Sequence, residues 1–349
     1  MTDSPITALD PTTFAIGFDH RDRARLHELW DEVLDSQRWT EGELVGQFEG
    51  AWETWNALPS AAFSSWSGAA MAALEFCRVR GEAVLCPSNT FMATPLSVIK
   101  AGARPVFVDC NREDLCVSFA DFEAKAERER PRAAWLVHIG GHIAFDVERI
   151  ADYCRDRGIF LIEDCAHAHG AQWRGRRPGT WGDAGVYSLY ATKTVSTGEG
   201  GVLVSKHDEL IEYARGYRNY GKPDYRVEGL SHRMSEFAAA IGLVQMDRLE
   251  EIVAWKNAVA RDHLDPLFSA HVELPDGMVS GLYKYVVFER IARSTGRVYD
   301  EPCHRLLGDP SDLPNTDWVA ANHSCVPLYY HGPEPPPDGS PWATIKEAD

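Results

Sequence analysis

The chain has 349 residues, of which 44% are hydrophobic and 25% charged, the balance of an ordinary globular protein with room for two domains. Its formal net charge of −17 argues against a nucleic-acid-binding surface, so an anionic substrate would need a local cluster of donors. No apolar run is long enough to predict a membrane span. The eight cysteines have no paired spacing, which favours free thiols in a reducing cytoplasm, and we expect no metal site.

Apolar residues recur at helical spacing over 21–37 and again from Val45 to Trp55, which predicts two amphipathic helices. Further along the chain, short buried strands alternate with helices. The predicted strands are 61–65, 83–86, 105–108, 134–138, 159–162, 184–190 and 202–205, and the predicted helices are 67–78, 93–101, 146–157 and 208–217. This alternation indicates an α/β fold with three α/β/α layers and a mostly parallel sheet.

The pattern changes near residue 250. A helix over 237–249 is followed by a second helix over 252–267 and by strand-like runs at 271–274 and 283–288. A weak helix is expected to close the chain after Tyr330. The sequence therefore predicts a large α/β domain over 1–250 and a smaller C-terminal α+β domain over 251–349.

The stretch from Ile159 to Ser205 carries the candidate chemistry. Its first strand ends on Glu163 and Asp164, and Lys193 follows its second strand. Functional groups gather at the carboxyl ends of strands in α/β sheets. Pyridoxal phosphate (PLP) needs such a pair, because a lysine holds its aldehyde and a carboxylate keeps its ring nitrogen protonated. Asp164 and Lys193 are the candidates, with Ser188 for the phosphate; alternatively, Asp164 caps a turn and Lys193 is a solvated surface lysine.

The ordered motifs of this stretch resemble the DegT/DnrJ/EryC1/StrS family of sugar aminotransferases, which are PLP enzymes with the aspartate-aminotransferase fold, fold type I. The resemblance extends over about residues 30 to 330. The residues that carry it are Glu163-Asp164-Cys165-Ala166-His167-Ala168-His169-Gly170, then Ser188, Lys193 and the glycine-rich turn at 198–201.

The resemblance implies roles for individual residues. Lys193 and Asp164 would be catalytic and would also contact the cofactor. A helix N-terminus opening at Ser67-Gly68-Ala69-Ala70 would cradle the phosphate, although Ala69 stands where the family has a threonine. Phe91 would stack on the cofactor ring. The complete predicted set of cofactor-binding residues is Gly68, Ala69, Ala70, Phe91, Asp164, His167, Ser188, Lys193 and Ser231.

Two further members of this set differ from the residues that many family members have. His167 would lie near the ring hydroxyl, where many members have a glutamine. Ser231 stands where the family has an asparagine that reaches the cofactor phosphate of the partner subunit. The shorter serine side chain leaves that contact open.

The resemblance further implies a homodimer with shared active sites, which transfers an amino group from L-glutamate or L-glutamine to the keto group of a nucleotide-linked deoxysugar. The product would serve a natural product or a surface polysaccharide. Alternative acceptors are a cyclitol ketone or a precursor of an aminated aromatic acid. A PLP-dependent sugar dehydratase would have a histidine in place of Lys193, and a non-catalytic sensor or regulator would not need Asp164, Ser188 and Lys193.

Overall fold

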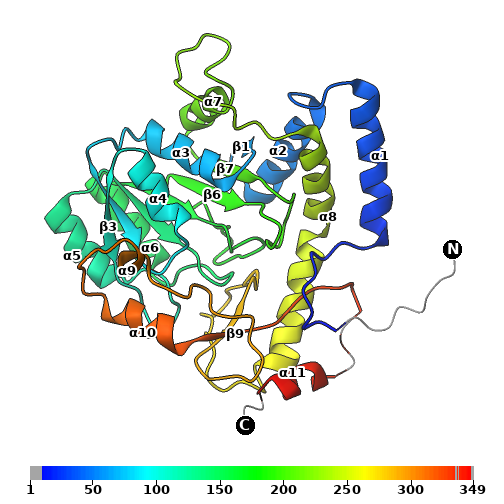
Figure 1. Cartoon of the computed structure of the whole chain (residues 1–349), viewed down its shortest axis with the longest axis vertical. Helices are drawn as coiled ribbons and strands as arrows, with labels where there is room; N and C mark the ends of the chain where they lie inside the picture. The colour runs from blue at the N-terminus through cyan, green and yellow to red at the C-terminus, as the bar shows by residue number, and fades with distance from the viewer. Residues whose placement is uncertain (1–9, 335, 337, 347–349) are drawn as a thin grey trace.

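The computed structural model describes residues 10–346 apart from 335 and 337, and its centre is a seven-stranded sheet (Figure 1). The strand order is β1-β7-β6-β5-β4-β2-β3, with β7 antiparallel to both of its neighbours and the strands from β6 to β3 paired in parallel. The strands are β1 (Ser60–Phe63), β2 (Ala83–Pro87), β3 (Arg104–Val108), β4 (Ala133–Val137), β5 (Phe160–Asp164), β6 (Ala184–Ser188) and β7 (Gly201–Ser205).

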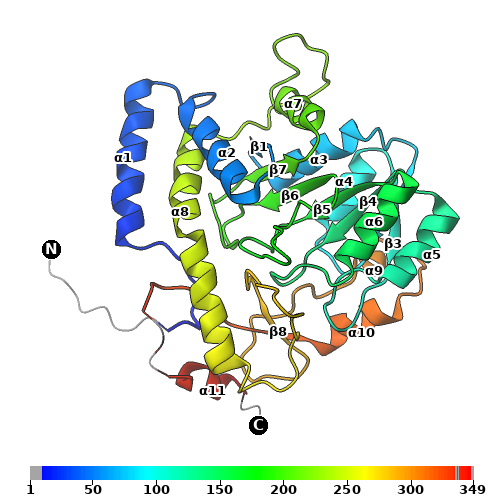
Figure 2. The same cartoon turned by 180° about the vertical axis from the view of Figure 1, so that it is seen from behind.

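Helices cover both faces of the sheet, as Figures 1 and 2 show from opposite sides. In β2, Val84 and Cys86 pack with α3, α4 and α7, whereas Leu85 packs with α5 and α6 on the other face. This period-two alternation explains why a continuous apolar strand needs a layer on each side. The helices are α1 (His20–Ser36), α2 (Glu43–Asn56), α3 (Trp66–Phe76), α4 (Ala93–Lys100), α5 (Phe119–Glu129), α6 (Val147–Arg157) and α7 (Asp208–Tyr217). The predicted three-layer fold is confirmed.

Helix α8 (Glu236–Val259) is one continuous helix, and a π-helical turn, η1 (Ala260–Leu264), extends it. The expectation of two separate helices meeting near residue 250 is therefore wrong, because Ile252, Val253 and Lys256 continue the buried side of the same helix. A domain boundary after residue 250 would fall inside α8 and stays a prediction.

The C-terminal part combines a two-stranded antiparallel sheet with short helices, which agrees with the predicted α+β character. Its elements are β8 (Tyr285–Val287), β9 (Ser324–Val326), α9 (Cys303–Leu306), α10 (Pro314–Asn322) and the closing helix α11 (Ser340–Lys346). The strand predicted at 271–274 is wrong. His271 makes only a single bridge to Val287, and the chain turns at Pro275, where Met278 N donates to its carbonyl oxygen. Among the described residues, no helix combines the length and apolar character needed to cross a membrane.

Candidate active site

A cavity of about 370 Å³ lies at the carboxyl ends of β5 and β6. Four parts of the chain line it: the start of α3, the segment that follows β2 with Phe91 and Thr94, the segments that follow β5 and β6, and the C-terminal part through Tyr283, Lys284 and residues 297–299. In a parallel sheet these strand ends meet at one edge, so residues far apart in the sequence converge there.

Asp164 ends β5 and lies in the wall of this cavity, only 5% exposed. Its carboxylate accepts hydrogen bonds from Trp66 Nε1 at 3.2 Å, Thr94 Oγ1 at 3.2 Å and the Ala166 amide at 3.0 Å. Burial raises the pKa of Asp164, while these donors and the nearby Lys193 oppose that shift. The result is a rigidly held carboxylate that suits a protonated ring nitrogen.

Glu163, the neighbour of Asp164, points to the opposite face of the sheet because side chains alternate along a strand. It contacts His138 Nε2 at 2.8 Å and accepts hydrogen bonds from the amides of Gly179, Trp181 and Gly182. These contacts fix the loop between β5 and β6. The two adjacent acids therefore have different tasks, one structural and one in the cavity.

Lys193 follows β6 and lines the cavity together with Asp164. Its ammonium nitrogen lies 4.5 Å from the centroid of the Tyr283 ring. Burial lowers the pKa of Lys193 to about 8; the Asp164 carboxylate opposes this shift and the charge of Lys284 adds to it. A lysine that is partly neutral near physiological pH is suited to act as a nucleophile and as a base.

His167 is buried in the cavity wall and stacks on Tyr283, with ring centroids 4.2 Å apart and planes at 28°. Tyr299 stacks with it as well, at 5.8 Å. Burial lowers the pKa of His167 well below its usual value, so the ring is neutral. Its Nδ1 atom has no hydrogen-bond partner among the described residues. Phe91, at 66% exposed, also lines this cavity.

The helix N-terminus expected at Ser67 begins earlier. Helix α3 starts at Trp66, and the hydroxyl of its cap Ser65 accepts a hydrogen bond from the Gly68 amide at 3.2 Å. Ser65, Trp66 and Ser67 line the cavity, whereas Gly68 does not. Gly68 packs against His232 instead, and a Cβ at position 68 would lie 3.0 Å from that ring. The amides of a first helical turn are unpaired and suit an anion, so Trp66 and Ser67 are better placed for a phosphate.

The remaining predicted cofactor contacts divide in two. Ser188, at the end of β6, lines the cavity and accepts a hydrogen bond from the Tyr190 amide. Ala69 and Ala70 are fully buried against the sheet and do not line the cavity. Ser231 is exposed outside it, in a bridge with Asn219, so its predicted contact with a partner subunit stays a prediction.

Several lining residues had not been singled out from the sequence. Thr94 belongs to the Pro-x-x-Thr-Phe-x-Ala-Thr pattern that contains Phe91, so the pattern itself was an available signal. Trp66, Arg297 and Tyr299 had no motif, because long-range folding alone brings them to the cavity.

The residues present fit PLP. An acid and a lysine lie in one cavity with a helix N-terminus, and an unpaired buried histidine nitrogen is free to meet a ring hydroxyl. Tyr283 and Tyr299 line the C-terminal side of the cavity, and both rings stack with His167.

Comparisons with known proteins agree with this geometry. GDP-perosamine synthase of Escherichia coli O157:H7 is 31% identical over 261 residues, covering 71% of this chain and 71% of the relative. The dTDP-3-amino-3,4,6-trideoxy-alpha-D-glucose transaminase of Micromonospora megalomicea subsp. nigra is 32% identical, covering 88% and 91%. The L-glutamine:scyllo-inosose aminotransferase of Streptomyces griseus is 32% identical, covering 74% and 67%.

Among solved structures, DesV of S. venezuelae in complex with a ketimine intermediate superposes with a TM-score of 0.82 at 26% identity, covering 88% of this chain and 90% of DesV. The profile of the DegT/DnrJ/EryC1/StrS aminotransferase family matches residues 20–288. The chain therefore belongs to the DegT/DnrJ/EryC1/StrS family of PLP-dependent aminotransferases.

Proposed function

We propose that this enzyme transfers an amino group from L-glutamate or L-glutamine to the keto group of a nucleotide-linked deoxysugar. The observation that carries the proposal is a cation in the wall of the large cavity: Arg297 lines it in addition to Lys193 and Lys284, whereas Asp164 and Glu199 are its acidic residues. In a chain with a net charge of −17, such a local cluster of cations favours an anionic substrate. The relatives named for GDP- and dTDP-linked products support the same acceptor class.

Each residue has a distinct task. PLP, when bound, supplies the ring that withdraws electrons from the reacting carbon. Asp164 keeps a proton on the ring nitrogen, and Trp66 and Thr94 fix the direction of its carboxylate. The Lys193 amine, once free, would take a proton from the carbon of the donor as a base and then, as an acid, deliver it to the cofactor carbon that keeps the amino group. Ser67, Ser188 and the first amides of α3 would bind the phosphate.

A cyclitol ketone is the second candidate acceptor, since one relative is named for scyllo-inosose. A neutral cyclitol gives Arg297 no anion to bind, so this cation favours the nucleotide sugar. Lys193 in the cavity speaks against the dehydratase, and the joint presence of Asp164, Ser188 and Lys193 speaks against a non-catalytic regulator.

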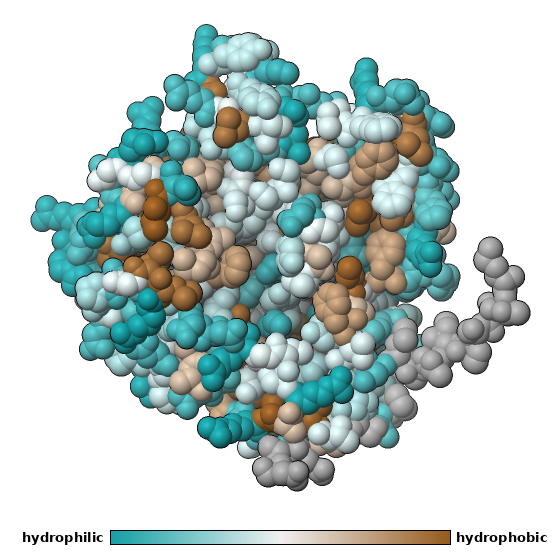
Figure 3. All heavy atoms as spheres, in the orientation of Figure 1, coloured by the Kyte–Doolittle hydropathy of each residue, from teal (hydrophilic) through white to brown (hydrophobic). Residues whose placement is uncertain are grey.

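A homodimer is supported by the exposed apolar side chains. Figure 3 shows them gathered over α4 and α9, where Leu96, Ile99 and Leu306 are 41%, 41% and 54% exposed. Phe91, at 66%, also lines the cavity, so a second copy on this face would complete the active site. All eight cysteines are buried and unpaired, which supports the expected cytoplasmic location.

The test is the visible absorption spectrum of the purified protein, recorded before and after addition of L-glutamate and, separately, L-glutamine. We expect a band of lysine-bound cofactor that one donor removes and that a nucleotide-linked keto sugar restores. Lys193→Ala should lack the lysine-bound band, whereas Lys206→Ala, an exposed lysine paired with Asp183, should keep it. A cofactor band that neither donor changes would contradict the proposal, and restoration by a cyclitol ketone alone would replace the acceptor.

A further inference from the structure

A second, smaller cavity of about 100 Å³ lies beside Lys193. It shares Thr192, Lys193, Tyr283 and Lys284 with the large cavity, so these side chains border both spaces. Its other walls are residues 14–17, residues Ile252 and Lys256 of α8, and Tyr329 and Tyr330.

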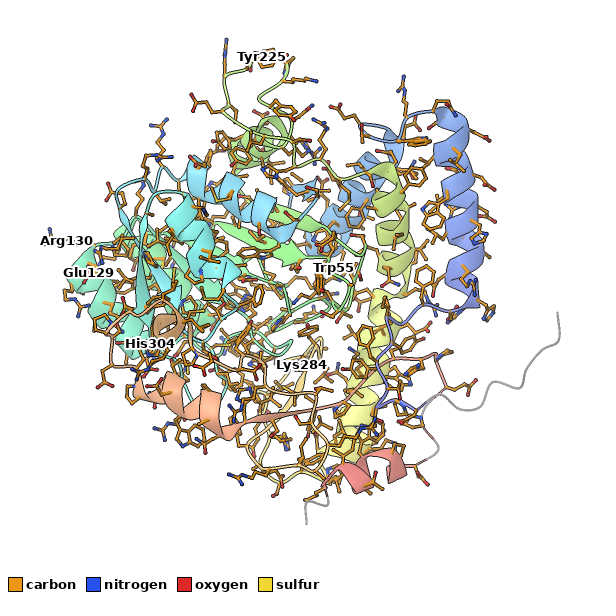
Figure 4. All side chains as sticks on the ribbon, in the orientation of Figure 1. Trp55, Glu129, Arg130, Tyr225, Lys284 and His304 are labelled. Atoms are coloured by element: carbon orange, nitrogen blue, oxygen red, sulfur yellow. The ribbon has the colours of Figure 1, made fainter. Side chains whose placement is uncertain are left out.

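The charged side chains that line this small cavity are all cationic. Its lining contains Lys193, Lys256 and Lys284, and among the described residues no acidic side chain lines it. Lys256 is 7% exposed, and its ammonium donates one recorded hydrogen bond, to Leu282 O at 3.1 Å. Lys284 is half-buried and forms no ion pair with any described residue, and Figure 4 labels it near α8. The buried ammonium of Lys256 has no carboxylate partner, which is costly, and an incoming anion would offset that cost.

We propose that Lys256 and Lys284 bind a carboxylate of the amino donor in this cavity, an inference that rests on the proposed aminotransferase function. The location supports it, because the cavity borders Lys193, whose amine must meet the donor. The size supports it as well: about 100 Å³ holds a carboxylate on a short chain and is too small for a nucleoside diphosphate. The large cavity keeps Arg297 for the anionic part of the acceptor.

The electrostatics of the two lysines point the same way. Burial lowers the pKa of Lys256 to about 8, and the nearby charge of Lys284 adds to that shift. A carboxylate between them would accept hydrogen bonds from both ammonium groups and remove their mutual repulsion. Both amino donors carry a carboxylate, so this site serves the first half of the reaction.

Calorimetric titration of the holoenzyme with glutarate tests the proposal. Glutarate has two carboxylates and no amino or keto group, so it binds without reacting. We expect Lys284→Met and Lys256→Met each to weaken binding by about tenfold or more, because each removes a charge-assisted hydrogen bond. Lys284→Arg should restore much of the affinity. Lys100→Met, which removes an exposed lysine at the end of α4, is the matched control and should bind like the wild type.

Three results would overturn the proposal. The first is no glutarate binding by the wild type, and the second is glutarate binding by both methionine variants that is as tight as in the wild type. The third is a loss of affinity for inorganic diphosphate that matches the loss for glutarate. The last outcome would assign these lysines to the acceptor. The titration involves no turnover, so it fails independently of the spectral test of transamination. In steady-state assays, Lys284→Met should raise the KM for the donor more than it lowers kcat.

Discussion

Lys256 illustrates how a binding residue weakens the fold that carries it. Its ammonium is buried on α8 with a single recorded hydrogen bond, and burial lowers its pKa to about 8 from an ordinary 10.5. Below about pH 8 the folded state must therefore keep a charge that the unfolded chain exposes to water. This penalty is relieved as the pH rises from about 8 towards 10.5, where the unfolded chain still binds the proton and the folded chain has released it.

We therefore predict that Lys256→Met raises the free energy of unfolding of the ligand-free protein at about pH 7 by roughly 1–3 kcal/mol, after subtraction of the lost hydrogen bond. The advantage over the wild type should shrink between about pH 8 and pH 10. Urea unfolding of both proteins at several pH values measures it, with Lys100→Met as the exposed control. A variant that is less stable than the wild type at every pH would contradict the account.

Single residues of the site were predictable from the sequence where they follow the end of a predicted strand. Asp164, Ser188 and Lys193 lie at or just after the ends of β5 and β6, which are neighbouring strands, so alternation and topology were enough to bring them together. The start of the helix that contains Ala69 was harder to place from the sequence. If a helix starts one residue earlier, a different set of side chains and amides faces the cavity. The start of α3 is set by its N-cap residue, Ser65.

Helix α2 begins without a cap of its own. Its N-cap residue is Gly42, which has no side chain, and the carboxylate of Glu236 takes over that task from the first turn of α8. Glu236 accepts hydrogen bonds from the Gly42 amide at 2.9 Å and the Leu44 amide at 2.7 Å. A Cβ at position 42 would lie 2.9 Å from the Glu236 carboxyl carbon, so glycine makes this approach possible.

We predict that Glu236→Ala lowers the free energy of unfolding by about 2 kcal/mol or more, because it leaves buried amides of α2 unpaired and removes a negative charge from a helix N-terminus. Glu43 is an exposed acid in the first turn of the same helix, so Glu43→Ala should lower the free energy of unfolding by only a few tenths of that amount. Chemical denaturation followed by circular dichroism compares the two variants. Equal losses would show that Glu236 does not cap α2.

The elements that the sequence predicted well are those whose pattern is local. The parallel strands and crossover helices follow from apolar runs and helical spacing, whereas the run at 271–274 has an extended pattern but too few partners to form a strand. The apparent end of a helix near residue 250 was misleading, since the burial of Ile252 and Lys256 comes from the C-terminal part packed on α8.

The whole molecule leaves a projecting segment uncovered between α7 and α8. It carries Tyr220, Tyr225 and Leu230, which are 46%, 68% and 61% exposed, and Figure 4 shows Tyr225 at the outer end of this projection. Exposed apolar groups on a projection are typical of a surface that meets a partner. Ser231 follows directly, so burial of this segment in a second copy would bring Ser231 to the contact between the two copies.

We accordingly predict that Leu230→Asp converts the proposed homodimer into monomers and lowers the retained PLP severalfold, because a carboxylate would be forced into an apolar contact between chains that each already carry a charge of −17. Analytical ultracentrifugation measures the mass and absorbance measures the cofactor. Leu34→Asp, at an equally apolar but separate site on α1 that is 45% exposed, should remain dimeric and keep its PLP. If Leu230→Asp sediments like the wild type with full cofactor content, the projecting segment is not the interface. The proposed homodimer would then use the apolar surface over α4 and α9 without this segment.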